Sequence, residues 1–206
     1  MMRVKGFEET DFTTFSIDGL AERMEAIQTR IQPKFRNIGS ELVDFLSMKL
    51  GNEVYLHIAK HARRTVNPPN DTWLAICDNK RGYKKHPHFQ VGLFDDRVFI
   101  WLALIYELPN KAKIAEAFIN HLEEIKNLPQ DFVVSLDHMK KDTIPISGLE
   151  KSHLERFRDV KKAEFLIGKH LDKNDDRVKD GEKLLETIKD TYEALIPFYR
   201  LALKEQ

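Results

Sequence analysis

The sequence predicts a single α+β domain spanning residues 1–206, with a central mixed or antiparallel sheet packed by helices from both ends of the chain. Two observations predict this class. Apolar residues recur every three to four positions near both termini, as in amphipathic helices, but alternate or run continuously in the middle, as in strands. Helices and strands are thus grouped along the chain, which is typical of α+β folds and argues against a doubly wound parallel sheet.

The first fifty residues are expected to be helical, after a short extended piece near 12–17. One helix would carry an apolar stripe made of Leu20, Met24, Ile27 and Ile31. Asp18 is placed to cap this helix, and Pro33 is expected to end or bend it. A second helix is expected to start near Ser40 and to stop at Gly51.

The middle of the chain is predicted to form the sheet. Strands are expected near 54–60, 72–77, 88–94, 98–106, 131–137 and 163–168. A tight turn at the two aspartates 95–96 would make the segments 88–94 and 98–106 antiparallel neighbours. The segment 98–106 is apolar on both faces, so it is expected to be a central strand with cover on both sides.

Helices are predicted again in the second half. Pro109 opens an amphipathic pattern that ends at Pro129. A short helix is expected near 149–160, and a long one from about Asp175 to Leu203, in which Pro197 would cause a kink or mark the last turn.

Composition excludes several classes of protein. The chain has 33 basic and 33 acidic residues and 42% apolar residues, a balance that excludes a disordered chain. The one cysteine, Cys77, excludes an internal disulfide framework and is expected to be a small buried residue. The N-terminal residues show no apolar signal region, and the longest apolar run, "VFIWLALIY", has about half the length of a membrane helix. We therefore expect a cytoplasmic protein that does not bind membranes.

Motifs for catalysis and metal binding are not evident. His57 and His61 have the spacing of two zinc ligands on a helix, but the predicted strand would separate them by about 13 Å. The zincin motif also needs a glutamate where Ile58 stands. The nucleophile elbow, the phosphate-binding loop and the dinucleotide fingerprint are missing as well. The sequence thus predicts no metal site and names no cofactor.

Positive charge is concentrated between residues 55 and 90. Seven lysines and arginines stand there against two aspartates, a net charge of +5 in a neutral chain, with four histidines and several aromatic residues between them. Positive charge with stacking groups suits phosphates and bases. Strand alternation would place Tyr55, His57, His61 and Arg63 on one face. We therefore predict a concave anion-binding site, with the alternative that these cations only decorate surface loops. The candidate residues are His57, His61, Arg63, Arg64, Trp73, Arg81, Tyr83, Lys84 and His88.

Three stretches resemble a known family. "GLAERMEAIQTRIQPKF", "HIAKHARRTVNPPNDTWLAICDNKRGYKKHPHFQVGLF" and "KKAEFLIGK" are similar to the YktB-like family of uncharacterised proteins from low-GC Gram-positive bacteria. The similarity runs over nearly the whole chain and implies a single α+β domain. It transfers no functional residue, because the family has no assigned activity or ligand.

Three functions stay open on the residues alone. The protein would bind a nucleotide or nucleic acid through the basic segment, act as an enzyme on a small phosphorylated or carboxylated substrate, or have a structural or protein-interaction role. In an enzyme, histidines would supply acid–base groups and arginines would hold the substrate. The sequence specifies neither an enzymatic activity nor an oligomeric state.

Overall fold

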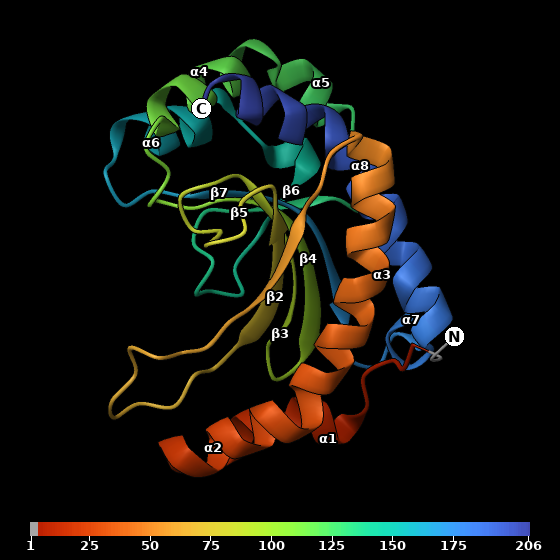
Figure 1. Cartoon of the computed structure of the whole chain (residues 1–206). Helices are drawn as coiled ribbons and strands as arrows, with labels where there is room; N and C mark the ends of the chain where they lie inside the picture. The colour runs from red at the N-terminus through yellow and green to blue at the C-terminus, as the bar shows by residue number, and fades with distance from the viewer. Residues whose placement is uncertain (1–3) are drawn as a thin grey trace.

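The computed structural model describes residues 4–206 and contains a seven-stranded sheet with the strand order β1-β2-β3-β4-β7-β5-β6 (Figure 1). The strands are β1 Tyr55–Ile58, β2 Thr72–Cys77, β3 His88–Leu93, β4 Arg97–Leu104, β5 Val133–Ser135, β6 Ile144–Pro145 and β7 Phe165–Asp172. Each pair of neighbours in this order is antiparallel. The α+β prediction is confirmed, with an antiparallel sheet.

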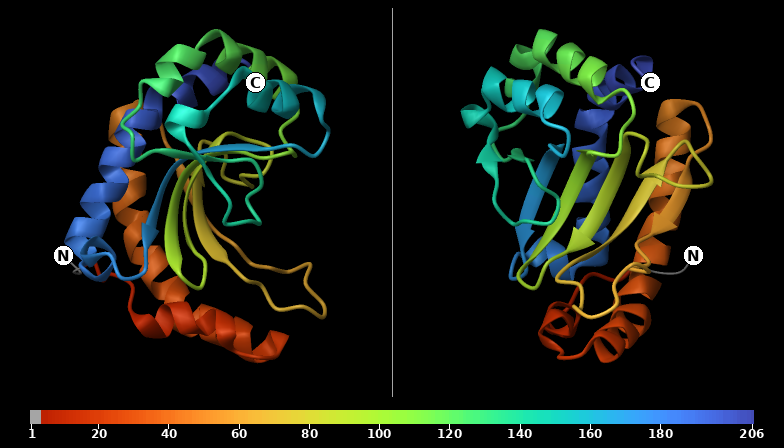
Figure 2. Two further views of the ribbon diagram at one scale, coloured as in Figure 1. Left: turned by 180° about the vertical axis from the view of Figure 1, so that it is seen from behind. Right: turned by 90° about the vertical axis from the view of Figure 1, so that its left-hand side faces the viewer.

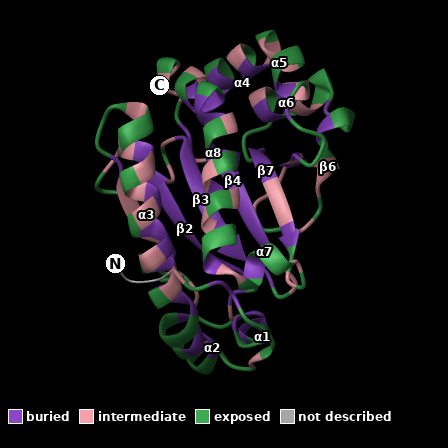
Figure 3. Ribbon diagram, turned by 90° about the vertical axis from the view of Figure 1, so that its right-hand side faces the viewer, coloured by how far each residue is buried: buried purple, intermediate pink, exposed green. Residues whose placement is uncertain are grey.

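Helices from both ends of the chain cover one face of this sheet. The helices are α1 Glu9–Phe12, α2 Leu20–Ala26, α3 Gln32–Leu50, α4 Lys111–Asn120, α5 Leu122–Lys126, α6 Lys151–Asp159, α7 Asp176–Lys179 and α8 Gly181–Lys204. The two long helices, α3 and α8, lie side by side across the sheet, and the strand residues behind them are buried (Figure 3). We call this side the helix face.

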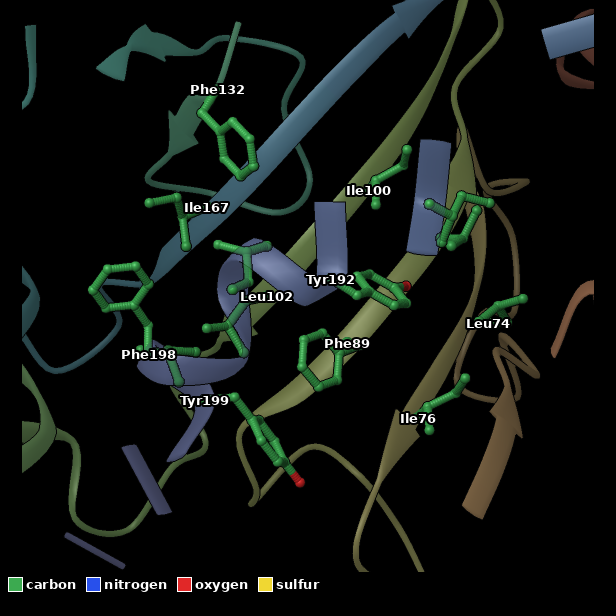
Figure 4. Close-up of a cluster of buried hydrophobic side chains, with 14 of the residues drawn as sticks. Leu74, Ile76, Phe89, Ile100, Leu102, Phe132, Ile167, Tyr192, Phe198 and Tyr199 are labelled. Carbon is green, nitrogen blue, oxygen red and sulfur yellow. The ribbon is translucent and has the colours of Figure 1, made fainter. Parts of the chain in front are cut away.

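The main core lies between the helix face of the sheet and the two long helices α3 and α8. Phe89 of β3 packs against Tyr192 and Tyr199 of α8, with ring centroids 4.6 and 4.8 Å apart (Figure 4). The Tyr192 hydroxyl also donates a hydrogen bond of 2.7 Å to the backbone carbonyl of Gln90, so its buried oxygen is satisfied. This contact fixes the C-terminal helix on the centre of the sheet.

The opposite face of the sheet is covered by loops rather than helices (Figure 2). We call it the loop face; Trp73, Ala75, Phe99, Trp101 and Leu166 pack together on it. Gly92 lies under this cluster, because a Cβ atom there would stand 2.2 Å from the Phe99 ring. Every residue from Val98 to Ile105 is buried, which confirms the prediction of a central strand covered on both sides.

The N-terminal region differs from its prediction. Residues 12–16 are not extended, and only Ile17 is: α1 ends at Phe12 and is followed directly by a 3-10 turn at Thr13–Ser16. Part of the cause is that the Thr14 hydroxyl donates to the carbonyl of Thr10, a local bond that favours a turn. Asp18 does not cap α2. Gly19 stands at the cap position with φ +87°, and no side chain caps this end.

Pro33 neither ends the first helix nor separates it from a second one. A π turn at Ile27–Ile31 joins α2 to α3, and Pro33 lies in the first turn of α3. Proline is tolerated here because it lies just after a π turn, where the regular bonding of each N–H to the carbonyl four residues earlier is already interrupted. The expected new start near Ser40 is therefore wrong, whereas the stop at Gly51, in left-handed conformation, is confirmed.

Two further helices and one short strand differ from their predictions. The helix expected after Pro109 is broken at His121 into α4 and α5. The C-terminal helix is also split, because the Asp180 carboxylate accepts the backbone N–H groups of Glu182 and Lys183 and starts α8 there. That helix continues past Pro197 to Lys204. The two-residue strand β6 was not predicted.

Candidate functional site

A pocket of about 940 Å³ opens on the loop face beside β1. It lies between residues 56–64, the loop at 79–86 and the residue pair 138–139. Eight of the nine candidate residues line it: His57, His61, Arg63, Arg64, Trp73, Arg81, Tyr83 and Lys84. The ninth, His88, is fully buried beside Tyr83, with ring centroids 4.9 Å apart. The structure thus brings the two basic segments to one pocket.

The first wall of the pocket is a loop that begins where β1 ends. Strand alternation places His57 on the loop face opposite Ala75, but the pleat stops at Ile58. His61 adopts φ +51°, a left-handed conformation that histidine tolerates better than most residues. His61 and Arg63 are therefore placed by a turn, and the prediction that they continue the strand face is wrong.

Arg23 of α2 holds the far end of this loop. Its guanidinium donates to the carbonyl of Pro69 at 2.9 Å and to the side-chain oxygen of Asn70 at 3.2 Å. Arg23 is mostly buried, and burial lowers its pKa. The N-terminal helix thus anchors a loop that belongs to the pocket.

The second wall is the loop after β2. The Asn79 side-chain oxygen accepts the backbone N–H groups of Arg81 and Gly82, an Asx turn that shapes the loop. His57 bonds the Asn79 carbonyl at 2.8 Å through Nε2. Both walls are therefore tied together at the side of the pocket.

Aromatic rings and imidazoles form the floor. Tyr83 lies 5.5 Å from the His57 ring, and Trp73 lies 5.5 Å from His61 and 5.8 Å from His138. Trp73 is 9% exposed, so it offers little surface for stacking. Tyr83 and His57 are only partly buried and present more ring surface to the pocket.

Two of the candidate histidines are neutral at neutral pH. Burial lowers the pKa of His61 to about 4 and that of His88 to about 3. Gln90 donates to Nε2 of His88 at 2.8 Å, so Nδ1 carries the proton and donates to the carbonyl of His86. These two side chains organise the floor and do not add positive charge.

Positive charge comes from the rim. Six cations line the pocket, Lys60, Arg63, Arg64, Arg81, Lys84 and Lys85, against one carboxylate, Glu107. Lys84 lies 3.9 Å from Glu107. Among residues 4–206, none of the other five cations has a carboxylate oxygen within 4.0 Å. The rim is therefore strongly and locally positive.

Cys77 lies below this pocket and is buried, as predicted. Its thiol donates to the carbonyl of Asn79, with 3.5 Å between sulfur and oxygen. Burial raises the pKa of Cys77 to about 11, so it stays protonated at neutral pH and is a poor nucleophile.

The sequence reasoning missed a cluster of ionisable groups beside the pocket. Glu164, 3% exposed, accepts a hydrogen bond from Nδ1 of His138 at 2.7 Å. Asp71 is 1% exposed, and neither of its carboxylate oxygens accepts a hydrogen bond from another residue of the described range 4–206. The only signal for these residues in the sequence is that Asp71 and Glu164 each directly precede an apolar strand.

Comparison with known proteins gives the family. The model described as "Domain of unknown function (DUF1054)" matches residues 7–199, which include every residue of the pocket. The chain belongs to the DUF1054 family. The resemblance found in the sequence is confirmed at this level, as membership of a family without an assigned function.

DUF1054 relatives are similar over their whole length. A UPF0637 protein of Oceanobacillus iheyensis is 70% identical, covering 97% of this chain and 98% of the relative. One from Shouchella clausii is 60% identical, covering 98% and 97%, and one from Listeria monocytogenes serotype 4b is 52% identical, covering 98% and 100%. Within residues 4–206 of this DUF1054 protein, no helix combines the length and apolar character needed to cross a bilayer.

Proposed function

We propose that this protein binds an anionic ligand, a nucleotide or a short piece of nucleic acid, in the basic pocket of the loop face. The observation that carries the proposal is the unbalanced charge of the rim, where six cations face one carboxylate. Elsewhere on the surface many cations are paired, as in Lys173–Glu9 and Arg158–Glu116. Unpaired cations gathered around one cavity repel one another, and an anion relieves that repulsion.

The chemistry of the rim suits phosphate groups. Arg63, Arg64 and Arg81 each offer a planar fork that binds two oxygens of a phosphate at once. Tyr83 and His57 offer ring surface for a base or another flat group. The pocket volume of about 940 Å³ falls in the range of small-molecule sites, so the size favours a nucleotide over a long nucleic acid.

A thermal-shift screen with AMP, ATP, GTP, pyrophosphate and a short single-stranded oligonucleotide tests the proposal. A ligand present at about 100 times its dissociation constant stabilises the folded chain by roughly 2.7 kcal/mol. We expect at least one of these anions to bind. The Arg64→Ala/Arg81→Ala variant should then lose at least about tenfold in affinity, or about 1.4 kcal/mol.

The matched control is Arg158→Ala/Arg177→Ala, which removes two arginines paired with carboxylates outside the pocket. Its affinity should equal that of the unmodified chain. An equal loss in both double variants, or no binding by any of the anions, would contradict the proposal.

Salt separates the two ligand classes, because the affinity for a nucleic acid falls steeply as salt rises, whereas the affinity for one nucleotide falls much less. An enzyme acting on a phosphorylated substrate would need the same rim.

A further inference from the structure

We propose that Asp137, His138 and Glu164 form a binding site for one divalent transition-metal ion such as Zn²⁺ or Mn²⁺. One ligand atom from each of the three side chains lies within 4.8 Å of the other two. The set offers one imidazole nitrogen and two carboxylate oxygens. Mixed nitrogen and oxygen donors favour Zn²⁺, Mn²⁺ or Fe²⁺ over Mg²⁺ and Ca²⁺, which prefer oxygen alone.

Two neighbouring strands hold the donors in place. Glu164 directly precedes β7, and its carboxylate also accepts the backbone N–H of His138 at 2.9 Å. Asp137 and His138 follow β5, which pairs with β7. The Ser135 hydroxyl donates to the carbonyl of Asp137 at 3.0 Å and fixes the exit from β5. The site is thus anchored to the sheet.

Asp71 is an independent observation that points to a cation here. Its buried carboxylate has no hydrogen bond from another residue in the part of the chain that the structure describes. Burial raises its pKa, and His138 is the first of the charged groups that oppose this effect. Asp71 stands two residues before Trp73, directly ahead of β2, and the Trp73 ring lies 5.8 Å from that of His138. The negative charges of Glu164, Asp71 and Asp137 all act on His138, and a divalent cation would balance them.

The geometry needs only small movements. Ligand bonds of about 2.0–2.2 Å require donor atoms roughly 3–4 Å apart. The Asp137 side chain is 44% exposed; it accepts the backbone N–H of Met139 at 2.9 Å through one oxygen, and its other oxygen lies 3.9 Å from Lys140, so turning toward the other two donors gives up only local, exposed contacts. A cation would replace the Nδ1 proton that His138 now shares with Glu164, so binding releases a proton and weakens in acid.

The surroundings leave room for further ligands. The three side chains line a second pocket of about 530 Å³, and His138 and Met139 line the basic pocket as well. An ion held here would lie at the boundary of the two pockets, with coordination positions open to water or to an oxygen of a bound molecule. The site does not depend on anion binding, and its test is separate.

Calorimetric titration of the chelator-treated full chain with ZnCl₂ and with MnCl₂ tests the proposal, with elemental analysis of the dialysed protein. We expect one ion per chain for at least one of these metals. Asp137→Asn and Glu164→Gln should each lower the affinity at least about tenfold. Asp137 is partly exposed, so Asp137→Asn should stay folded. The Arg64→Ala/Arg81→Ala variant should bind the metal normally.

His121→Ala is the matched control, because His121 lies between α4 and α5 and lines neither pocket. Its Nδ1 bonds the carbonyl of Ala117. It should keep full affinity. Absence of binding for both metals would overturn the proposal. Unchanged affinity in both Asp137→Asn and Glu164→Gln would overturn it too. Loss of binding in His57→Ala, with full binding in Asp137→Asn, would place the ion in the basic pocket and also refute the assignment.

Discussion

The Trp73 indole donates a hydrogen bond to the Tyr83 hydroxyl, with 3.1 Å between nitrogen and oxygen. This bond joins the second strand of the sheet to the loop that carries Arg81 and Lys84. Tyr83 also contacts the rings of His57 and His88. The Tyr83 phenol, together with the turn at Asn79, therefore holds the loop that carries Arg81 and Lys84 in position.

Replacing Tyr83 by Phe should weaken both the fold and the pocket. The buried indole N–H would lose its acceptor, which costs about 1–2 kcal/mol of unfolding free energy. Affinity for the anion found in the screen should fall, because the loop is held less firmly. The control is Tyr55→Phe, since that hydroxyl bonds Glu53 on the exposed surface. Urea unfolding and ligand titration measure both effects; equal behaviour of the two variants would disprove the role of Tyr83.

Much of the sheet could be predicted from the sequence, because its signal is local. The run from Val98 to Ile105 is apolar on both faces, and the aspartates at 95–96 mark the turn before it, where Phe94 and Arg97 bond across the hairpin. The N-terminal helices were harder to predict. A proline usually ends a helix, and only the π turn before Pro33 shows how this helix continues.

The candidate site was predictable only in part. The excess of basic residues between 55 and 90 is visible in any one sequence, so the rim was found. The cluster of Asp137, His138 and Glu164 was not found, because its members come from two segments that meet only when β5 pairs with β7. Burial of His88 also depends on long-range packing, and sequence alone assigned this histidine to the surface of the site.

Truncating Leu102 to Ala should destabilise the fold by about 2–5 kcal/mol. Leu102 is fully buried in the main core, between the sheet and α8 (Figure 4). The cavity left by the lost side chain cannot close, because β4 pairs on both sides, with β3 and β7. Met48→Ala is the control, since Met48 is 74% exposed and should change stability by less than about 0.5 kcal/mol. Chemical denaturation with both variants makes the comparison.

Stability should fall in mild acid. Burial lowers the pKa of His61 and His170 to about 4 and that of His88 to about 3. In the unfolded chain these groups take up protons below about pH 6.5. Between pH 6.5 and about pH 4 the unfolded state therefore binds protons that the folded state does not. Each histidine therefore lowers the unfolding free energy by roughly 1.4 kcal/mol per pH unit below 6.5.

Asp71 acts in the opposite direction over part of this range. Its folded pKa is raised to about 6, so between pH 6 and about 4 the folded chain binds a proton that the unfolded chain does not. The net loss should be roughly 2–3 kcal/mol per pH unit. Urea unfolding at pH 7.5, 6.5, 5.5 and 4.5 measures it, and His88→Gln should make the profile shallower. A flat profile would show that the histidines are not held neutral.

Asp71→Asn should stabilise the protein at pH 8. The folded chain there holds a buried carboxylate that accepts no hydrogen bond from another residue, and burial raises its pKa to about 6. A raised carboxylate pKa lowers stability above that pH, so the neutral amide should recover about 1–3 kcal/mol. The gain should vanish below about pH 4, where Asp71 is protonated in both states. The exposed Asp44→Asn variant is the control and should show no gain at either pH.

A stabilising effect of Asp71→Asn would mean that the Asp71 carboxylate lowers the stability of the fold, as expected of a group kept for binding or catalysis. A loss of stability at pH 8 would instead mean that Asp71 supports the fold.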